Sequence, residues 1–301
     1  SGYYKLTSSD WKWKYLISNS GKANIYGGTI DIWADDTTGN PYNSGSYLYN
    51  AKGAIAKIEN LKITSRPIYS IYNLGTVDVT NSILTSRTIN TETGIMNLTN
   101  TTVKNLSNSF REVTNSESGE INIDGGEYNV PVNNSSTGTI NIGTKDGNVS
   151  TEMPVITGKT YGVSNENSGK VNFYDGVVSG ESGAFYGTVN EVEPGYKIVT
   201  NKTDTLTSAT LTLVGDDEKV AVLNGINFTS LQDAINSASD TTESIITLYA
   251  NIVFDSNITV PANKNIKLYL NGYTLNKGSY DFTGEGKITV IDGTSTNALA
   301  S

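Results

Sequence analysis

The sequence contains neither cysteine nor histidine among its 301 residues. Without cysteine the chain cannot form disulfide bonds, use a thiolate nucleophile or bind a metal through sulfur. Without histidine it lacks the commonest general base and the commonest ligand of transition metals. These absences favour a protein that is not an enzyme and has no cofactor. They leave calcium, which needs only oxygen ligands, as the one metal ion to consider.

Charged residues are also scarce, at 17 % of the chain, and the net charge is −9. Because an acidic chain repels a phosphate backbone, we expect no nucleic-acid partner. No apolar run approaches the length of a transmembrane helix, and the first residues do not resemble a signal peptide. We therefore expect no membrane insertion in this segment, which we interpret as part of a longer protein.

The chain is rich instead in polar uncharged residues, with 30 glycines and 18 tyrosines, and one pattern recurs seven times. An aliphatic residue is followed by any residue, by Asn, by Gly a few residues later, and then by alternating apolar positions. The segment from Ile71 through Asn73 and Gly75 to Val79 is a clear copy. In the fourth copy Thr91 replaces the Asn. The copies begin at Ile17, Leu48, Ile71, Ile89, Val113, Val132 and Val163.

Each copy contains three short strands separated by turns, which is the content of one solenoid coil. Alternation sends Val77 and Val79 inward and Asp78 outward. We attribute the recurring Asn and Gly to turns, because both tolerate the left-handed backbone region. The repeat predicts an all-β protein, a right-handed parallel β-helix of seven or eight coils over residues 1–195. Leucine-rich repeats and a β-sandwich are the alternatives, and they fit the Leu content and the repeat interval less well.

The pattern changes after about residue 195. We predict linker strands over 196–219 and the start of a second, truncated β-helix over 220–301. One short α-helix is predicted at about 229–238, where Ser230 and Asp233 have capping-box spacing and Leu231, Ala234 and Ile235 share one face. This helix would cover the open apolar end of the second β-helix.

Four segments between residues 220 and 275 resemble the opening of pectate-lyase-like parallel β-helix modules. They are residues 220–222, 228–235, 245–248 and 268–275. Such modules are common in large cell-wall-attached proteins of Gram-positive bacteria, often described as adhesins. The resemblance implies a β-helix fold and an extracellular location, either attached to the cell wall or secreted.

Polysaccharide lyases and hydrolases share this fold, so an enzyme is the main alternative. Hydrolases of this shape resemble one another in an Asn-Thr-Asp motif, an Asp-Asp pair and a Gly-His motif. This sequence contains only the pairs Asp35-Asp36 and Asp216-Asp217. Because glycoside hydrolysis needs two carboxylates that face each other across a bond, neighbouring aspartates in an extended loop fit it poorly.

The first long coil is the best candidate for binding, because recognition residues commonly sit on a loop held by a rigid scaffold. Its aromatic, acidic and amide side chains could pack on sugar rings and bond their hydroxyl groups. The alternative is that its aromatic residues only pack the loop against the solenoid. The predicted ligand-binding residues are Trp33, Asp35, Asp36, Asn40, Tyr42, Tyr47 and Tyr49.

Asp124 and Asp175 occupy matching turns of different coils and are the candidate calcium ligands. Taken together, these features predict a non-catalytic cell-surface adhesin or glycan-binding stalk. Its partner would be a host or environmental glycan, or a surface protein. The other hypotheses are a β-helix lyase or hydrolase, and a structural spacer or self-associating module.

Overall fold

The computed structural model describes residues 15–30, 46–64, 69–105, 112–145 and 153–293. They belong to two compact units. The first comprises residues 1–192 and 199–211, and the second comprises residues 193–198 and 212–301. In the described residues no helix is long and apolar enough to cross a membrane.

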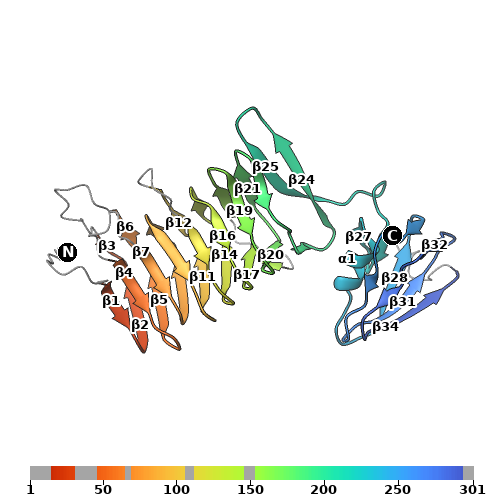
Figure 1. The fold of residues 1–301 in the computed structure, drawn as a ribbon, viewed down its shortest axis with the longest axis horizontal. Coiled ribbons are helices and arrows are strands. Elements are labelled where there is room, and N and C mark those ends of the chain that lie inside the picture. Colours follow the sequence, from red (N-terminus) through yellow and green to blue (C-terminus); the bar gives the residue numbers. More distant parts are fainter. Residues whose placement is uncertain (1–14, 31–45, 65–68, 106–111, 146–152, 294–301) are drawn as a thin grey trace. The chain divides into compact units, whose positions relative to one another are not determined.

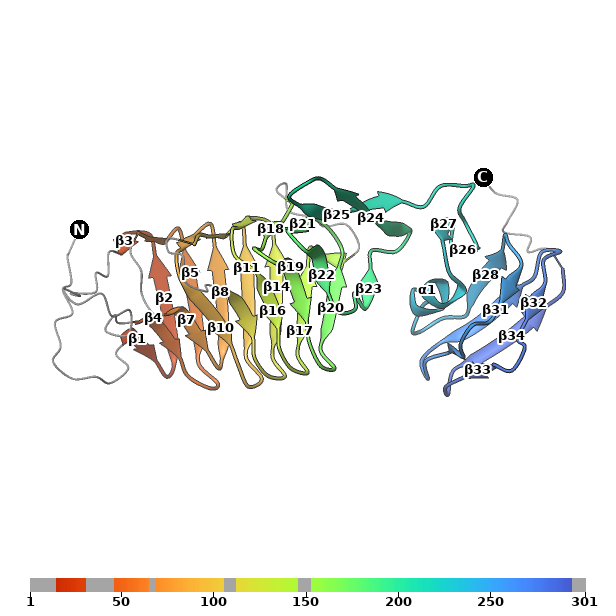
Figure 2. The ribbon, with the colours of Figure 1, turned by 45° about the horizontal axis from the view of Figure 1, so that its top comes forward.

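The first unit is a parallel β-helix in which each coil contributes one strand to each of three sheets (Figures 1 and 2). The first sheet has the order β1 (Tyr15–Asn19), β4 (Ser46–Asn50), β7 (Tyr69–Asn73), β10 (Arg87–Asn90), β13 (Val113–Asn115), β16 (Val132–Asn134), β19 (Tyr161–Asn165) and β22 (Gly183–Tyr186). The second has the order β2 (Lys22–Tyr26), β5 (Ile55–Glu59), β8 (Thr76–Thr80), β11 (Ile95–Thr99), β14 (Glu120–Asp124), β17 (Thr139–Ile142), β20 (Lys170–Phe173) and β23 (Glu191–Val192). The seven predicted copies thus supply successive coils, which confirms the all-β solenoid.

The third sheet consists of shorter strands and ends in two longer ones. Its parallel strands are β3 (Thr29–Ile30), β6 (Lys62–Ile63), β9 (Ile83–Leu84), β12 (Thr102–Val103), β15 (Glu127–Tyr128), β18 (Val155–Thr157) and β21 (Val177–Gly180). β25 (Thr207–Leu213) pairs antiparallel with β21, and β24 (Tyr196–Lys202) lies beyond it. These last two are the strands that the sequence predicted over 196–219.

The alternation predicted for the second sheet is confirmed. Val77 and Val79 are fully buried, as are Ile121 and Ile123 in β14, whereas Asp78 on the opposite face is partly exposed. The parallel register places apolar residues of successive coils beside one another, since Val77 pairs with Met96 and Met96 pairs with Ile121. Since a single coil cannot bury this apolar face, the stacking of coils creates the core.

The recurring Asn is not a turn residue, and this corrects our interpretation of the repeat. Seven asparagines lie on the buried side of the first sheet and form the inner asparagine ladder: Asn19, Asn50, Asn73, Asn90, Asn115, Asn134 and Asn165. The Nδ2 of each of the first six donates to the Oδ1 of the next member at 2.7–3.3 Å. Asn165 Nδ2 donates to Asn190 Oδ1 at 3.1 Å. Asn115 Nδ2 also donates to a backbone carbonyl oxygen, Gly119 O, at 2.7 Å. None of the seven has a positive φ.

The fourth copy also needs correction, because the ladder is not interrupted at Thr91. Asn90 pairs with Asn73 on one side and Asn115 on the other, and Thr88 takes the aliphatic position opposite Ile71. A register shift between Arg87 and Thr88 accommodates the difference. The predicted register of this copy was therefore wrong by one residue.

From the third copy of the repeat onward, the recurring Gly is required for space. Gly53 has a positive φ (74°) and the other six repeat glycines do not. A Cβ on Gly119 would lie 2.5 Å from Asn90 Nδ2 and from Gly94 O. Left-handed backbone also occurs at other turn residues, such as Asn81 (φ 49°), Asn100 (φ 45°) and Gly126 (φ 88°). Asn and Gly thus recur together because the ladder amide packs against the backbone of the next coil.

The second unit opens with the hairpin β26 (Ala221–Leu223) and β27 (Ile226–Phe228), followed by α1 (Leu231–Asn236). Three further strands extend its main sheet in the order β27-β26-β28-β31-β34: β28 (Ser244–Leu248), β31 (Asn265–Tyr269) and β34 (Lys287–Ile291). Two short parallel pairs complete the coils: β29 (Ile252–Val253) with β32 (Leu275–Asn276), and β30 (Ile258–Thr259) with β33 (Phe282–Thr283).

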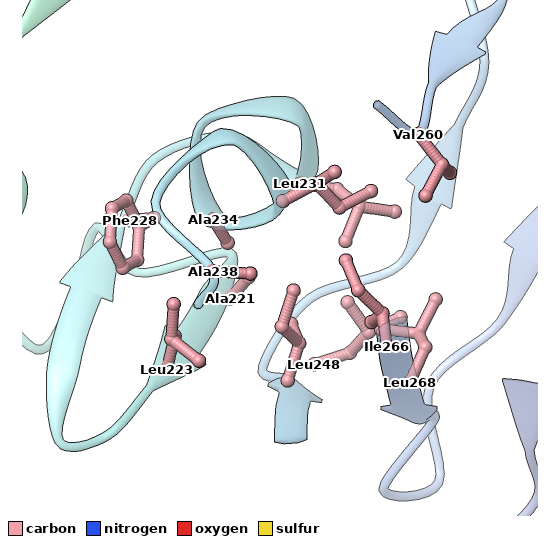
Figure 3. Packing of buried hydrophobic residues seen from close by; sticks show 12 residues of the cluster. Ala221, Leu223, Phe228, Leu231, Ala234, Ala238, Leu248, Val260, Ile266 and Leu268 are labelled. Atoms are coloured by element: carbon pink, nitrogen blue, oxygen red, sulfur yellow. The ribbon is translucent and has the colours of Figure 1, made fainter. Parts of the chain in front are cut away.

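Helix α1 covers the apolar interior of this second unit, as predicted, although it is shorter than 229–238. The Ser230 side chain accepts a hydrogen bond from Asp233 N at 3.1 Å, which caps the first turn. Leu231, Ala234 and Ile235 are buried in a cluster with strand residues such as Leu248 and Leu268 (Figure 3).

Candidate functional site

The predicted binding loop lies mostly outside the described residues. Trp33, Asp35, Asp36, Asn40 and Tyr42 fall within 31–45, and their assignment as ligand-binding residues stays a prediction.

The two described members of the predicted site have different environments, although both lie on β4. The Tyr47 side chain is fully buried, and its hydroxyl finds no hydrogen-bond partner among the described residues. Burial raises the pKa of Tyr47 to about 12. Tyr49 is only half-buried and contacts tyrosines of the neighbouring coils. Tyr47 therefore fits the packing alternative, whereas Tyr49 remains available to a ligand.

Tyr49 belongs to a row of aromatic rings that crosses successive coils of the first sheet. The Tyr15 and Tyr49 ring centres are 5.0 Å apart, and those of Tyr49 and Tyr72 are 6.0 Å apart with planes 19° from parallel. Tyr69 meets the edge of Tyr72 at 5.4 Å. All three ring-centre distances lie within the range of favourable aromatic pairs.

Charged and amide side chains continue this row across the next coils. The Arg87 guanidinium lies 5.8 Å from the centre of the Tyr69 ring and pairs with Glu112 at 2.8 Å. Asn133 Nδ2 donates to the other oxygen of Glu112 at 2.5 Å. The Arg87 side chain is 38 % exposed and that of Glu112 is 22 % exposed. The contacts therefore fix the charged groups at the surface without removing them from solvent.

We call this row the tyrosine–arginine strip; it comprises Tyr15, Tyr49, Tyr72, Tyr69, Arg87, Glu112 and Asn133. Its members lie on or beside six strands that neighbour one another in the order β1-β4-β7-β10-β13-β16. Five strand spacings of about 4.8 Å give the strip a length of about 24 Å. Tyr49 and Tyr72 each lie directly before a repeat Asn, and this shared position in the repeat could have predicted that they are neighbours on the sheet. Asn133 has the same position, directly before Asn134, whereas no such pattern marks Arg87 or Glu112.

The phenols of Tyr15 and Tyr72 are neutral at physiological pH. Burial, together with the neighbouring Tyr72, Tyr69 and Tyr49, raises the pKa of Tyr15 to about 12. Burial also raises the pKa of Tyr72, and Tyr69 and Tyr49 add to the effect. A neutral phenol both donates and accepts hydrogen bonds. The strip thus combines apolar ring surface with hydroxyl, guanidinium, carboxylate and amide groups.

A second polar row, the outer amide ladder, runs along the exposed side of the second sheet. Asn97 donates to Asp78 at 2.6 Å, Asn122 to Asn97 at 2.8 Å, Asn141 to Asn122 at 2.7 Å and Asn172 to Asn141 at 2.8 Å. All five side chains are partly buried and hold one another in place. The row lacks aromatic residues, so it is a weaker candidate for a binding surface than the strip.

The two candidate calcium ligands do not lie on adjacent coils. Asp124 ends β14 and Asp175 follows β20, while β17 lies between these strands. The backbones are thus two strand spacings, about 10 Å, apart. Asp175 Oδ1 accepts a hydrogen bond from Gly176 N at 2.8 Å. The described residues contain no group of three acidic side chains that could hold a metal ion, and calcium binding stays a prediction.

Comparisons with protein families, with curated proteins and with solved structures gave no match to this chain. The resemblance of residues 220–275 to pectate-lyase-like modules therefore stays a prediction at the level of family. The geometry itself establishes the fold, which is a parallel β-helix, or β-solenoid, with one short helix.

Proposed function

We propose that this chain is a non-catalytic module of a bacterial cell-surface protein that binds an extended glycan along the tyrosine–arginine strip. The observation that carries the proposal is the continuity of the strip, in which tyrosines of three consecutive coils lead directly to Arg87, Glu112 and Asn133.

The chemistry of the strip suits a sugar chain better than an apolar ligand. Phenol hydroxyls, a guanidinium, a carboxylate and an amide match the mixed donors and acceptors of sugar hydroxyl groups. Ring surface on Tyr49 and Tyr72 supplies the apolar contact that sugar C–H groups need. Ring centres 5.0 and 6.0 Å apart along the coils provide a regular series of contacts for a regular polymer.

The proposed location is extracellular, either attached to the cell wall of a Gram-positive bacterium or secreted. A chain without cysteine, rich in Asn, Gly and Tyr, supports this placement. The resemblance of residues 220–275 to modules of such surface proteins supports it further. In this setting a rigid solenoid would present the strip away from the cell.

A glycan array with the purified chain tests the proposal, with calcium and then with a chelator. We expect Tyr72→Ala and Arg87→Ala each to weaken binding about tenfold, because one aromatic or charge-assisted contact contributes roughly 1–2 kcal/mol. Tyr280→Ala is the matched control, since Tyr280 is 40 % exposed and belongs to the second unit.

Three outcomes separate the hypotheses. If binding is unchanged in both strip variants but lost in Trp33→Ala, the glycan site lies on the predicted loop and not on the strip. Binding lost only with the chelator would point to calcium. An absence of binding to any glycan would overturn the proposal and favour a rigid spacer, for which the two amide ladders are a sufficient basis.

A further inference from the structure

Two tyrosines form a close pair across the last two strands of the first sheet. Tyr161 lies on β19 and Tyr186 on β22, with ring centres 5.3 Å apart and planes tilted by 46°. The Tyr161 ring packs over Gly183 of the last coil, where a Cβ would lie 3.1 Å from Tyr161 Cε1. Tyr186 is 52 % exposed. The Tyr161 ring is therefore packed against the last coil, while the Tyr186 ring is accessible to solvent.

We propose that Tyr161 and Tyr186 are a site of oxidative phenol coupling, at which a dityrosine bond joins the last two coils. The proposal is independent of glycan binding, because neither residue belongs to the tyrosine–arginine strip. The same arrangement recurs between the first two strands, where Tyr15 and Tyr49 lie 5.0 Å apart with planes tilted by 44°. Both ends of the first sheet thus carry a tyrosine pair that bridges adjacent coils.

The coupling needs an external two-electron oxidant, for which we name hydrogen peroxide acting through a peroxidase. Each phenol loses one electron and one proton and becomes a phenoxyl radical. The two radicals form a carbon–carbon bond between ring positions ortho to oxygen, and the two ortho hydrogens then move to the oxygens and restore both phenols. The protein loses two hydrogen atoms in total, and the peroxide is reduced to two molecules of water.

The position of the pair explains what the bond would do. β22 is the last strand of the first sheet and has a strand neighbour on one side only, so the terminal coil is the one most prone to local opening. A bond from residue 161 to residue 186 closes a loop of 186 − 161 = 25 residues. Closing such a loop restricts the opened state, as a disulfide does. A chain without cysteine has no disulfide with which to do this.

Treatment of the full chain with peroxidase and hydrogen peroxide, followed by trypsin and mass spectrometry, tests the proposal. We expect the peptide of residues 160–170 joined to that of 171–197, at their summed mass less two hydrogen atoms, in monomeric protein. Fragmentation should place the bond on Tyr186, since 171–197 also contains Tyr174 and Tyr196. Tyr186→Phe keeps the ring but cannot form a phenoxyl radical, so this linked peptide should disappear. Tyr26→Phe should retain it, although Tyr26 is the more exposed at 64 %.

Two results would overturn the proposal. One is that the peptide of residues 160–170 stays unlinked in monomeric protein in which other tyrosines have formed dityrosine. The other is a 161–186 linkage found only in covalent dimers and lost on dilution, which would show coupling between molecules. A dityrosine bond between Tyr15 and Tyr49 would join two other tryptic peptides, so it would not be confused with the 161–186 linkage.

Discussion

At the scale of single residues, the inner asparagine ladder is the feature with the largest expected energetic effect. Six of the seven ladder asparagines are buried, and an unsatisfied polar group there costs about 1–3 kcal/mol. Asn115 illustrates the arrangement, since it accepts from Asn90 at 3.0 Å and donates to Gly119 O at 2.7 Å and Asn134 at 3.3 Å. The ladder also fixes register, because a shift by one residue would break every amide contact.

We therefore expect Asn115→Ala to lower the free energy of unfolding by about 3 kcal/mol or more, since several buried partners lose a bond at once. Urea denaturation measures the change. Asn122→Ala is the matched control in the same coil, because Asn122 belongs to the outer amide ladder and is half-buried. It should cost less than about 1 kcal/mol. Equal losses in the two variants would contradict a special role for the inner ladder.

Tyr47 provides a second prediction at this scale, because its hydroxyl is buried without a partner among the described residues. Tyr47→Phe removes the unsatisfied group, and we expect stability at neutral pH to rise by up to about 1 kcal/mol.

The same variant should change the response to alkaline pH. The pKa of Tyr47 is about 12 in the folded chain against an ordinary tyrosine value of 10.0, so between these values only the unfolded state releases the proton. Stability is retained below pH 10 and falls as the pH rises towards 12. Chemical denaturation at pH 9 and pH 11 should show a smaller loss for Tyr47→Phe than for the parent chain. An identical loss in both proteins would contradict the assignment.

At the scale of elements, adjacent coils approach so closely from the third copy of the repeat onward that the glycine there is necessary. Gly119 lies between two coils, and its missing side chain leaves room for Asn90 and for the backbone at Gly94. Gly21 occupies the same phase in the first described coil, and a Cβ there would meet nothing within 4 Å. The same residue type at the same position of the repeat therefore carries different constraints in different coils.

We expect Gly119→Ala to destabilise the chain by about 1–3 kcal/mol, the usual range for overpacking. Gly21→Ala should change stability by no more than about 0.5 kcal/mol. Thermal unfolding of the two variants makes the comparison, and a neutral Gly119→Ala would show that the coils can separate to admit a methyl group.

At the scale of the whole molecule, the parallel β-helix converts a sequence repeat into a continuous surface. Residues far apart in the chain, such as Tyr15 and Asn133, come to lie along one line because each coil adds one strand to the same sheet. A ligand on this surface would contact several coils at once.

The length of the strip predicts how affinity should depend on ligand length. Affinity for oligosaccharides of the bound glycan should rise with each added sugar until the strip of about 24 Å is covered, and should then reach a plateau. Isothermal titration calorimetry with a size series measures this. Full affinity for a disaccharide would instead indicate a compact site, and the strip would then not act as one surface.

Local sequence pattern determined the fold class of this protein. Alternating apolar residues and a recurring turn pattern specify stacked coils, because both are properties of one strand and its neighbours along the chain. Helix α1 was equally predictable, since its cap and its apolar face lie within ten residues. By contrast, the reason for the recurring Asn and Gly was predicted wrongly, because their partners lie one coil away in space and 17–31 residues away in sequence.

Only the tertiary structure decided which side chains meet. Tyr47 and Tyr49 are two residues apart and chemically identical, yet one is buried and the other belongs to the strip. Arg87 and Glu112 carry no local signature, and they meet Asn133 through the parallel register of β10, β13 and β16. The physical reason is that coils of unequal length stack in register, so the neighbours of a surface residue depend on the length of every coil between them.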